Sequence, residues 1–113
     1  MEGSWVKSFP VAVTICDHYG VILEMNDRAA EVFAKRGGRE LVGKNVLYCH
    51  PQSAREKLAE LLKRGGTNCY TTENNGVKRL VYQAPWYKDG EYQGLVELLF
   101  EIPADMPHFV RGE

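Results

Sequence analysis

Apolar positions recur along the chain with two different periods, and these periods divide it into strands and helices. The runs 11–17 and 21–25 are apolar and rich in β-branched residues, and the short turn between them predicts a hairpin. A helical pattern follows, in which Asn26 or Asp27 is a suitable N-terminal cap and Gly37 is a stop signal. The first third of the chain is therefore expected to form two strands and a helix.

A second helix is predicted after an irregular stretch. Residues 39–52 contain too many interruptions for one element and are expected to form turns or short 3₁₀ pieces. Ser53 and Glu56 match the capping box that opens many helices, and Gly65 and Gly66 follow the last turn. The apolar stripe of this helix consists of Leu58, Leu61 and Leu62.

The last third of the chain predicts three strands. The runs 68–73, 77–87 and 91–102 are separated by Asn75-Gly76 and by Asp89-Gly90. Asn-Gly and Asp-Gly are the strongest short hairpin signals, because both residues tolerate a positive φ. The three strands are therefore expected to form an antiparallel meander.

Side chains alternate between the two faces of a strand, so residue parity assigns positions to faces. One face carries apolar residues throughout: Leu80, Tyr82, Ala84, Trp86, Val96, Leu98, Phe100 and Ile102. The other face mixes apolar with polar residues: Arg79, Val81, Gln83, Tyr87, Leu95, Glu97, Leu99 and Glu101. We expect the uniformly apolar face to pack on the helices and the mixed face to meet a partner.

Composition narrows the class of protein. With 113 residues and 44% hydrophobic residues, the chain is expected to be one globular domain. The formal net charge of −1 and the lack of a basic face argue against nucleic-acid binding. No stretch approaches the ~20 apolar residues of a membrane span. The three cysteines form no pattern typical of disulfides, which favours a cytoplasmic location.

The order of the predicted elements (two strands, a helix, short helices, a helix and three strands) resembles that of the PAS domain. Individual residues agree with the resemblance: Asp17, Gly20, Asn26, Ala29-Ala30 and the turn Gly43-Lys44-Asn45-Val46. The stretch WYKDGEYQGLVEL is similar to the closing hairpin of that family. The segment Cys49-His50-Pro51 also resembles one found in small bacterial and archaeal PAS modules, some of which are attached to hemerythrin-like or kinase modules.

The resemblance covers about residues 9–102. It implies an α+β fold, with a five-stranded antiparallel sheet and helices on one face. Residues 1–8 would then form an N-terminal cap segment, and residues 103–113 would form a C-terminal tail.

PAS domains are sensor or interaction modules, so the resemblance implies a role in signal transduction through a ligand pocket between sheet and helices. Parity suggests the residues of this pocket: Val13, Ile15, Ile22, Phe33, Leu58, Leu62, Tyr82, Ala84, Val96, Leu98 and Phe100, with Tyr48 and His50 at the rim. The mixed face suggests the interface of a homodimer, formed by Trp5, Val6, Val81, Leu95, Glu97 and Leu99. A separate signalling protein is the expected partner, and a small molecule is an alternative or additional one.

Cys49 and His50 raise the alternative of a haem-based gas or redox sensor, because thiolate and imidazole both ligate haem iron. The two residues are adjacent, and adjacent side chains of an extended chain point in opposite directions, so they are poorly placed to share one ion. The simpler interpretation is that Pro51 fixes a helix start and that His50 is a polar residue at the pocket rim. A flavin photoadduct is not expected, because the position after the turn glycine lacks the required cysteine.

No catalytic motif is present in the sequence, so we expect a module that is not an enzyme. The chain closes with FEIPADMPHFVRGE, where Pro103 and Pro107 interrupt any continuous helix. We therefore expect the tail to pack Met106 or Phe109 onto the domain without forming a helix, and signals to pass by non-covalent association.

Overall fold

Five strands form one antiparallel sheet in the order β2-β1-β5-β4-β3. The structure is a computed structural model that describes residues 3–112, and the side chain of Cys49 lies outside this description. The strands are β1 (Ala12–Cys16), β2 (Ile22–Met25), β3 (Asn68–Asn74), β4 (Val77–Lys88) and β5 (Glu91–Ile102). The α+β fold and the five-stranded antiparallel sheet expected from the sequence are thereby confirmed.

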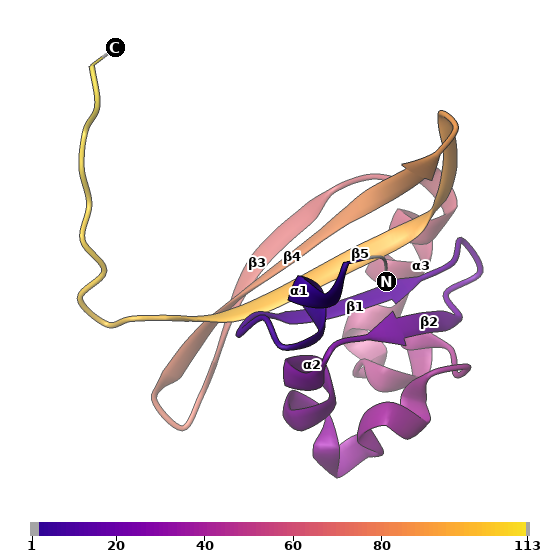
Figure 1. Ribbon diagram of the computed structural model, residues 1–113, viewed down its shortest axis with the longest axis horizontal. Coiled ribbons are helices and arrows are strands. Elements are labelled where there is room, and N and C mark those ends of the chain that lie inside the picture. The colour runs from indigo at the N-terminus through magenta and orange to yellow at the C-terminus, as the bar shows by residue number, and fades with distance from the viewer. Residues whose placement is uncertain (1–2, 113) are drawn as a thin grey trace.

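The helices lie mainly on one face of this sheet. They are α1 (Ser4–Lys7), α2 (Asp27–Val32) and α3 (Gln52–Arg64), with 3₁₀ turns η1 (Ala34–Arg36), η2 (Gly38–Leu41) and η3 (Val46–Cys49). The short α1 is drawn in front of β1 and β5, whereas α3 lies behind the sheet (Figure 1). Within residues 3–112, no helix is long and apolar enough to cross a membrane.

Both predicted hairpin turns are confirmed. Asn75 and Asp89 have φ of 53° and 51°, and the glycines that follow them also have positive φ. Two consecutive residues with positive φ define the type I′ turn, whose twist matches that of the flanking strands. These turns fix the register of β4 against both β3 and β5, and so decide which side chains share a face.

Asn26 joins the N-terminal segment to the sheet and to α2. Its Oδ1 accepts hydrogen bonds from the backbone N–H groups of Val13 (2.9 Å) and Ala29 (3.0 Å), the second of which caps α2. Its Nδ2 donates to the carbonyl oxygens of Val6 (3.0 Å) and Val11 (2.8 Å). The predicted cap is therefore correct, and the same buried amide also holds the chain around Val6 in place.

The start of α3 differs from the prediction. The helix begins at Gln52 with Pro51 as its N-cap, and no side chain caps it. Ser53 and Glu56 lie inside the helix, so the predicted capping box is wrong. Pro51 sets the extended backbone that precedes the helix, as its fixed φ allows. The end is as predicted, because Gly65 adopts the left-handed conformation and donates to the carbonyl of Leu61 (2.8 Å).

Strand register shows that the sheet faces were assigned the wrong way round. Thr14 and Gln83 both pair with Glu97, and Ala12 and Val81 both pair with Leu99. We call this side, which packs on α2 and α3, the inner face: Ala12, Thr14, Cys16, Val81, Gln83, Leu95, Glu97 and Leu99. The outer face is the opposite side: Val13, Ile15, Leu80, Tyr82, Ala84, Val96, Leu98 and Phe100.

The expectation for the mixed face is therefore corrected. Val81, Leu95, Glu97 and Leu99 were expected at an interface but lie on the inner face, where Val81 and Leu95 are 4% and 3% exposed. Conversely, seven residues expected in the pocket lie on the outer face: Val13, Ile15, Tyr82, Ala84, Val96, Leu98 and Phe100. Uniform apolarity does not mark the core side of this sheet, because the side that packs on the helices buries the polar residues Thr14 and Gln83.

The two terminal segments also depart from expectation. Val6 is buried, and Trp5 is exposed with its ring edge-on to Phe9. The helix α1 that carries both residues lies on the other side of the sheet from α3 (Figure 1), so they do not cover Leu95 or Leu99 on the inner face. Residues 103–112 form no helix, as expected. The tail leads away from the domain in Figure 1, and Phe109 is 70% exposed, whereas Met106 is 53% exposed and borders a surface groove with Val77 and Ile102. Neither side chain is buried against the domain.

Candidate functional site

A small cavity of about 30 Å³ lies between the inner face and the helices. By volume it has room for a water molecule or two. Strands β1, β2, β4 and β5 supply one wall, and the helical layer supplies the other. The lining residues are Thr14, Cys16, Ile22, Met25, Phe33, Leu41, Val46, His50, Leu58, Gln83, Leu95 and Glu97.

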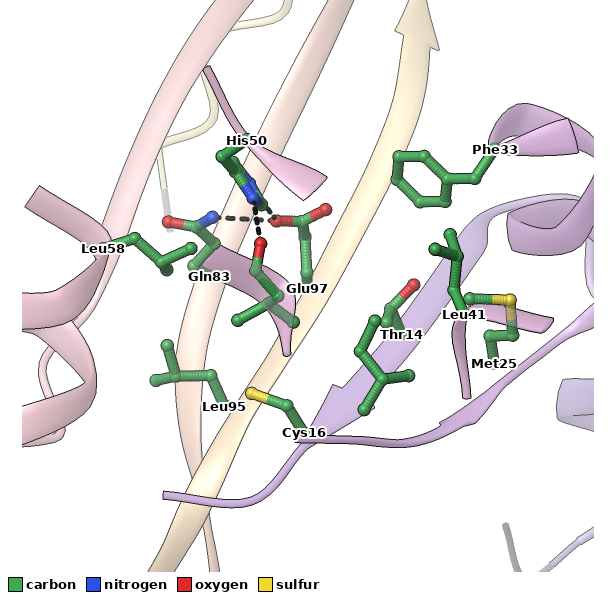
Figure 2. A pocket seen from close by; sticks show the side chains of 12 residues that line it. Thr14, Cys16, Met25, Phe33, Leu41, His50, Leu58, Gln83, Leu95 and Glu97 are labelled. Carbon is green, nitrogen blue, oxygen red and sulfur yellow. Dashed lines mark hydrogen bonds and ion pairs between the residues drawn. The ribbon is translucent and has the colours of Figure 1, made fainter. Parts of the chain in front are cut away.

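One end of this otherwise apolar cavity is polar. The Gln83 amide donates to Oε2 of Glu97 (2.8 Å), and Nε2 of His50 lies 3.6 Å from the same oxygen. Asn68 in turn donates to Oε1 of Gln83 (3.2 Å). Figure 2 shows His50, Gln83 and Glu97 converging at one end, with Phe33, Leu41 and Met25 at the other. We call His50, Asn68, Gln83 and Glu97 the polar cluster.

The protonation of His50 follows from its two contacts. Nδ1 lies 2.9 Å from the carbonyl oxygen of Val46, and since a carbonyl only accepts, Nδ1 carries a proton. Nε2 faces the Glu97 carboxylate, which also favours a proton there. Burial by itself lowers the pKa of His50, but Glu97 and the Val46 carbonyl outweigh it and raise that pKa above its ordinary value. The contacts with Val46 and Glu97 therefore favour the imidazolium form of His50.

A groove on the surface adjoins the cavity. It has a volume of about 270 Å³ and lies between α3 and β3, lined by His50, Ala54, Lys57, Leu58, Asn68, Tyr70 and Gln83. Three of these residues, His50, Leu58 and Gln83, also line the cavity. The wall that separates the cavity from the surface thus consists of a few side chains, two of them in the polar cluster.

The structure brings some of the predicted pocket residues to this cavity. Ile22, Phe33, His50 and Leu58 line it. Leu62 is buried in the neighbouring core but does not line the cavity. Tyr48 is 77% exposed and borders a separate surface groove with Arg36 and Lys44, so its expected place at the rim is wrong.

Sequence reasoning missed the polar side of the cavity. Thr14, Gln83 and Glu97 lie on neighbouring strands in register with one another. Each alternates with apolar neighbours, and for Gln83 and Glu97 this pattern led to the expectation of a face that meets a partner. The available signal was that a threonine, a glutamine and a glutamate share one face of three adjacent strands, where they can bond to each other.

Cys16 lines the cavity but is a weak nucleophile. Burial is the main cause that raises the pKa of its thiol to about 11. The reactive form of cysteine is the thiolate, so a thiol with this pKa stays protonated and inert near neutral pH. Cys16 therefore contributes a small apolar surface to the cavity.

Haem does not fit this site. A cavity of about 30 Å³ is far smaller than a macrocycle with four pyrrole rings. The two ring nitrogens of His50 are also engaged by Val46 and Glu97, which leaves neither directed at an iron. Cys49, the other candidate ligand, has its side chain outside the described part of the structure. Among the described residues, no group of three His, Cys, Asp or Glu side chains is arranged to hold a metal ion.

Comparisons with known proteins agree with this architecture at the level of the fold. No protein-family model matches the sequence, and no curated protein does. The PAS domain of BvgS from Bordetella pertussis is 20% identical, with a TM-score of 0.67 over 87% of this chain and 81% of that chain. A PAS domain from Colwellia psychrerythraea is 14% identical, with a TM-score of 0.66 over 87% of this chain and 91% of that chain.

A third solved structure is the Aer2 receptor of Vibrio cholerae, described as a dual PAS-haem oxygen sensor. It is 19% identical, with a TM-score of 0.62 over 82% of this chain and 95% of that chain. These likenesses confirm that the chain has the PAS fold. The particular resemblance of the Cys49-His50-Pro51 segment stays a prediction.

Proposed function

We propose that this chain is a sensory module of signal transduction that binds a small molecule in the cavity beneath the inner face. The observation that carries the proposal is a cavity that is apolar along most of its wall and ends in a buried polar cluster. Binding sites for small molecules typically combine an apolar lining with a few placed polar groups. The Aer2 receptor, which has the same fold, is by its description a sensor.

The position of the polar cluster suggests how occupancy changes the protein. His50 follows η3 and comes two residues before α3, whereas Glu97, Gln83 and Asn68 lie on β5, β4 and β3. A ligand that alters these contacts alters the link between the helices and three strands. The module would then act by binding and conformational change, without catalysis of its own.

A fragment screen tests whether the cavity is a binding site. Fragments of up to four non-hydrogen atoms are screened by amide NMR shifts, and hits are expected to move the signals of Thr14 and Gln83. The variant Thr14→Leu fills part of the cavity and should lose these hits, whereas the outer-face variant Leu98→Ala should keep them. The proposal fails if no fragment moves these signals, or if Thr14→Leu binds the same fragments equally well.

The outer face supports a second part of the proposal, namely self-association. Its side chains are apolar, all of them except the buried Val13 are partly exposed, and Tyr82 in its centre is 39% exposed. Exposed apolar patches on a sheet mark contacts with other proteins. We propose that a second copy of the chain covers this face, so that the homodimer uses the opposite side of the sheet from the one first expected.

A further inference from the structure

Glu97 is a carboxylate of intermediate burial, and only one of its two oxygens has polar contacts among the described residues. Its side chain is 17% exposed. Both of its contacts, with Gln83 and with His50, are made through Oε2, and Oε1 has no hydrogen-bond partner among the described residues. A carboxylate away from water is costly unless it is paired and hydrogen-bonded. The site therefore favours a further donor, and most of all a positively charged one.

The other residues that line the cavity determine the shape of the ligand that can carry this donor. In Figure 2 the Glu97 carboxylate has His50 and Gln83 on one side and the side chains of Phe33 and Thr14 on the other. Beyond Thr14, the wall is formed by apolar side chains such as Met25 and Leu41. A fitting ligand has one cationic head next to Glu97 and a short apolar body, which the unbranched Met25 can adjust to accommodate.

We propose that the cavity binds a small primary amine, whose ammonium group pairs with Glu97 in place of the protonated His50. This inference rests on the proposed function and names the ligand class of the same site. The ammonium ion offers three donors, enough to reach both carboxylate oxygens or the Thr14 hydroxyl. An anion of the same size would be repelled by Glu97, and a neutral alcohol would contribute a hydrogen bond without charge.

Replacement of the His50 imidazolium by the ligand's ammonium group at Glu97 couples binding to the release of a proton. When the amine binds, the imidazolium of His50 loses its contact with Glu97 and releases one proton to solvent, while Nδ1 keeps its proton on the Val46 carbonyl. Below the pKa of His50 the imidazolium competes with the amine, and above that pKa it does not. The amine itself stays protonated, because alkyl amines have pKa values of about 10. Affinity is therefore expected to rise with pH through the titration of His50.

Other charged groups near His50 influence its titration, but none of those described takes the place of Glu97 as its carboxylate partner. Arg36 on η1 opposes protonation of His50 through its charge. On α3, Arg55 donates through Nε to the backbone oxygen of His50 (3.1 Å), and Lys57 lines the adjoining groove. On β3, burial and then Glu97 raise the pKa of Tyr70, so its phenol is neutral here. Glu97 is thus the carboxylate that His50 faces among the described residues.

The groove between α3 and β3 provides the route of entry. His50, Leu58 and Gln83 line both the groove and the cavity, so a rotation of His50 away from Glu97 would join the two. The same movement that frees the carboxylate would open the path for the ligand. The cavity by itself has room for only a water molecule or two, so the ligand needs the space that movement of His50 and adjustment of Met25 would add, and its body is limited to a few carbon atoms.

Titration with three probes of equal length tests the proposal: propylamine, propanol and propionate. Binding is followed by amide NMR shifts of Thr14, Gln83 and Glu97 in the full chain at pH 8 and pH 6. We expect propylamine to bind at least tenfold more tightly than propanol at pH 8, and propionate not to bind. Affinity for propylamine should be several-fold weaker at pH 6 than at pH 8.

Two variants separate charge from shape. Glu97→Gln keeps the size of the side chain and should lose the preference for the amine over the alcohol. His50→Gln should keep this preference but bind propylamine equally well at pH 6 and pH 8. If propanol or propionate binds as tightly as propylamine, the amine assignment is wrong while the ligand cavity stands. If none of the probes moves these signals and the fragment screen also finds nothing, the proposed function fails as well.

Discussion

The two faces of the sheet differ in a way that reverses the usual association of apolar residues with burial. Glu97 and Leu98 are neighbours on β5, yet the glutamate points to the helices and the leucine points to the outer face. On the inner face, Gln83 is only 3% exposed, whereas Tyr82, one residue earlier on the outer face, is 39% exposed. The more polar side of this sheet is therefore the more buried one.

This contrast has a physical reason on each side. Polar groups can be buried when they bond to one another, and Asn68, Gln83, Glu97 and His50 form such a chain. Apolar groups can remain at a surface when that surface meets a partner. These differences support the proposal that the inner face recognises a small molecule and that the outer face contacts another copy of the protein.

The largest expected effect comes from a matched pair of leucines on β5. Leu95→Ala removes a side chain that is 3% exposed and leaves a void, so it should lower the free energy of unfolding by about 3 kcal/mol. Leu98→Ala removes a half-buried side chain of the outer face and should cost about 1 kcal/mol in the monomer. Urea unfolding at low protein concentration measures both values. A larger loss for Leu98→Ala would contradict the face assignment.

Leu98→Glu should change the free energy of unfolding of the monomer less than Leu95→Ala does, but it should strongly weaken dimer formation. The charge should turn the proposed dimer into a monomer, because it would be buried without a partner in the interface. Light scattering at micromolar concentration measures the mass of the wild type and the variant. The exposed α3 residue Glu60 provides a control, since Glu60→Lys should leave the dimer intact. A monomeric wild type, or a dimeric Leu98→Glu, would refute the proposed interface.

The smallest effect is a pH dependence that originates on the inner face. Because the pKa of His50 is raised in the folded protein, its contact with Glu97 contributes stability fully below the unfolded pKa of about 6.5. That contribution is lost as the pH rises through the raised pKa. The difference in unfolding free energy between wild type and His50→Gln should therefore fall from pH 5.5 to pH 8.5. His18→Gln, at an exposed turn residue, should behave like wild type. A difference that grows with pH would contradict this account.

Local signals in the sequence predicted local structure well. Asn75-Gly76 and Asp89-Gly90 form the expected hairpin turns, because their conformational demands are met within a few residues. Asn26 caps α2 as predicted, although its bonds to Val6 and Val11 depend on tertiary contacts that no local pattern contains. The capping box at Ser53 failed because Pro51 already fixes the helix start.

The candidate site was harder to predict, because parity separates two faces without indicating which one is covered. His50 was identified by its residue type and Phe33 by its helical position, and both line the cavity. Thr14 and Gln83 were missed, and Glu97 was expected at an interface, because parity along a single strand does not show that these side chains meet. Only the pairing of β1, β4 and β5 brings them together.

The most direct test of the contrast between the faces measures the solvent access of two leucines. Methyl groups of Leu95 and Leu98 are observed by NMR in the presence of a soluble gadolinium chelate, over a range of protein concentrations. We predict that Leu95 is shielded from the chelate at every concentration. Leu98 should be relaxed strongly in dilute solution and become shielded as the dimer forms. Strong relaxation of Leu95, or shielding of Leu98 that does not depend on concentration, would contradict the account.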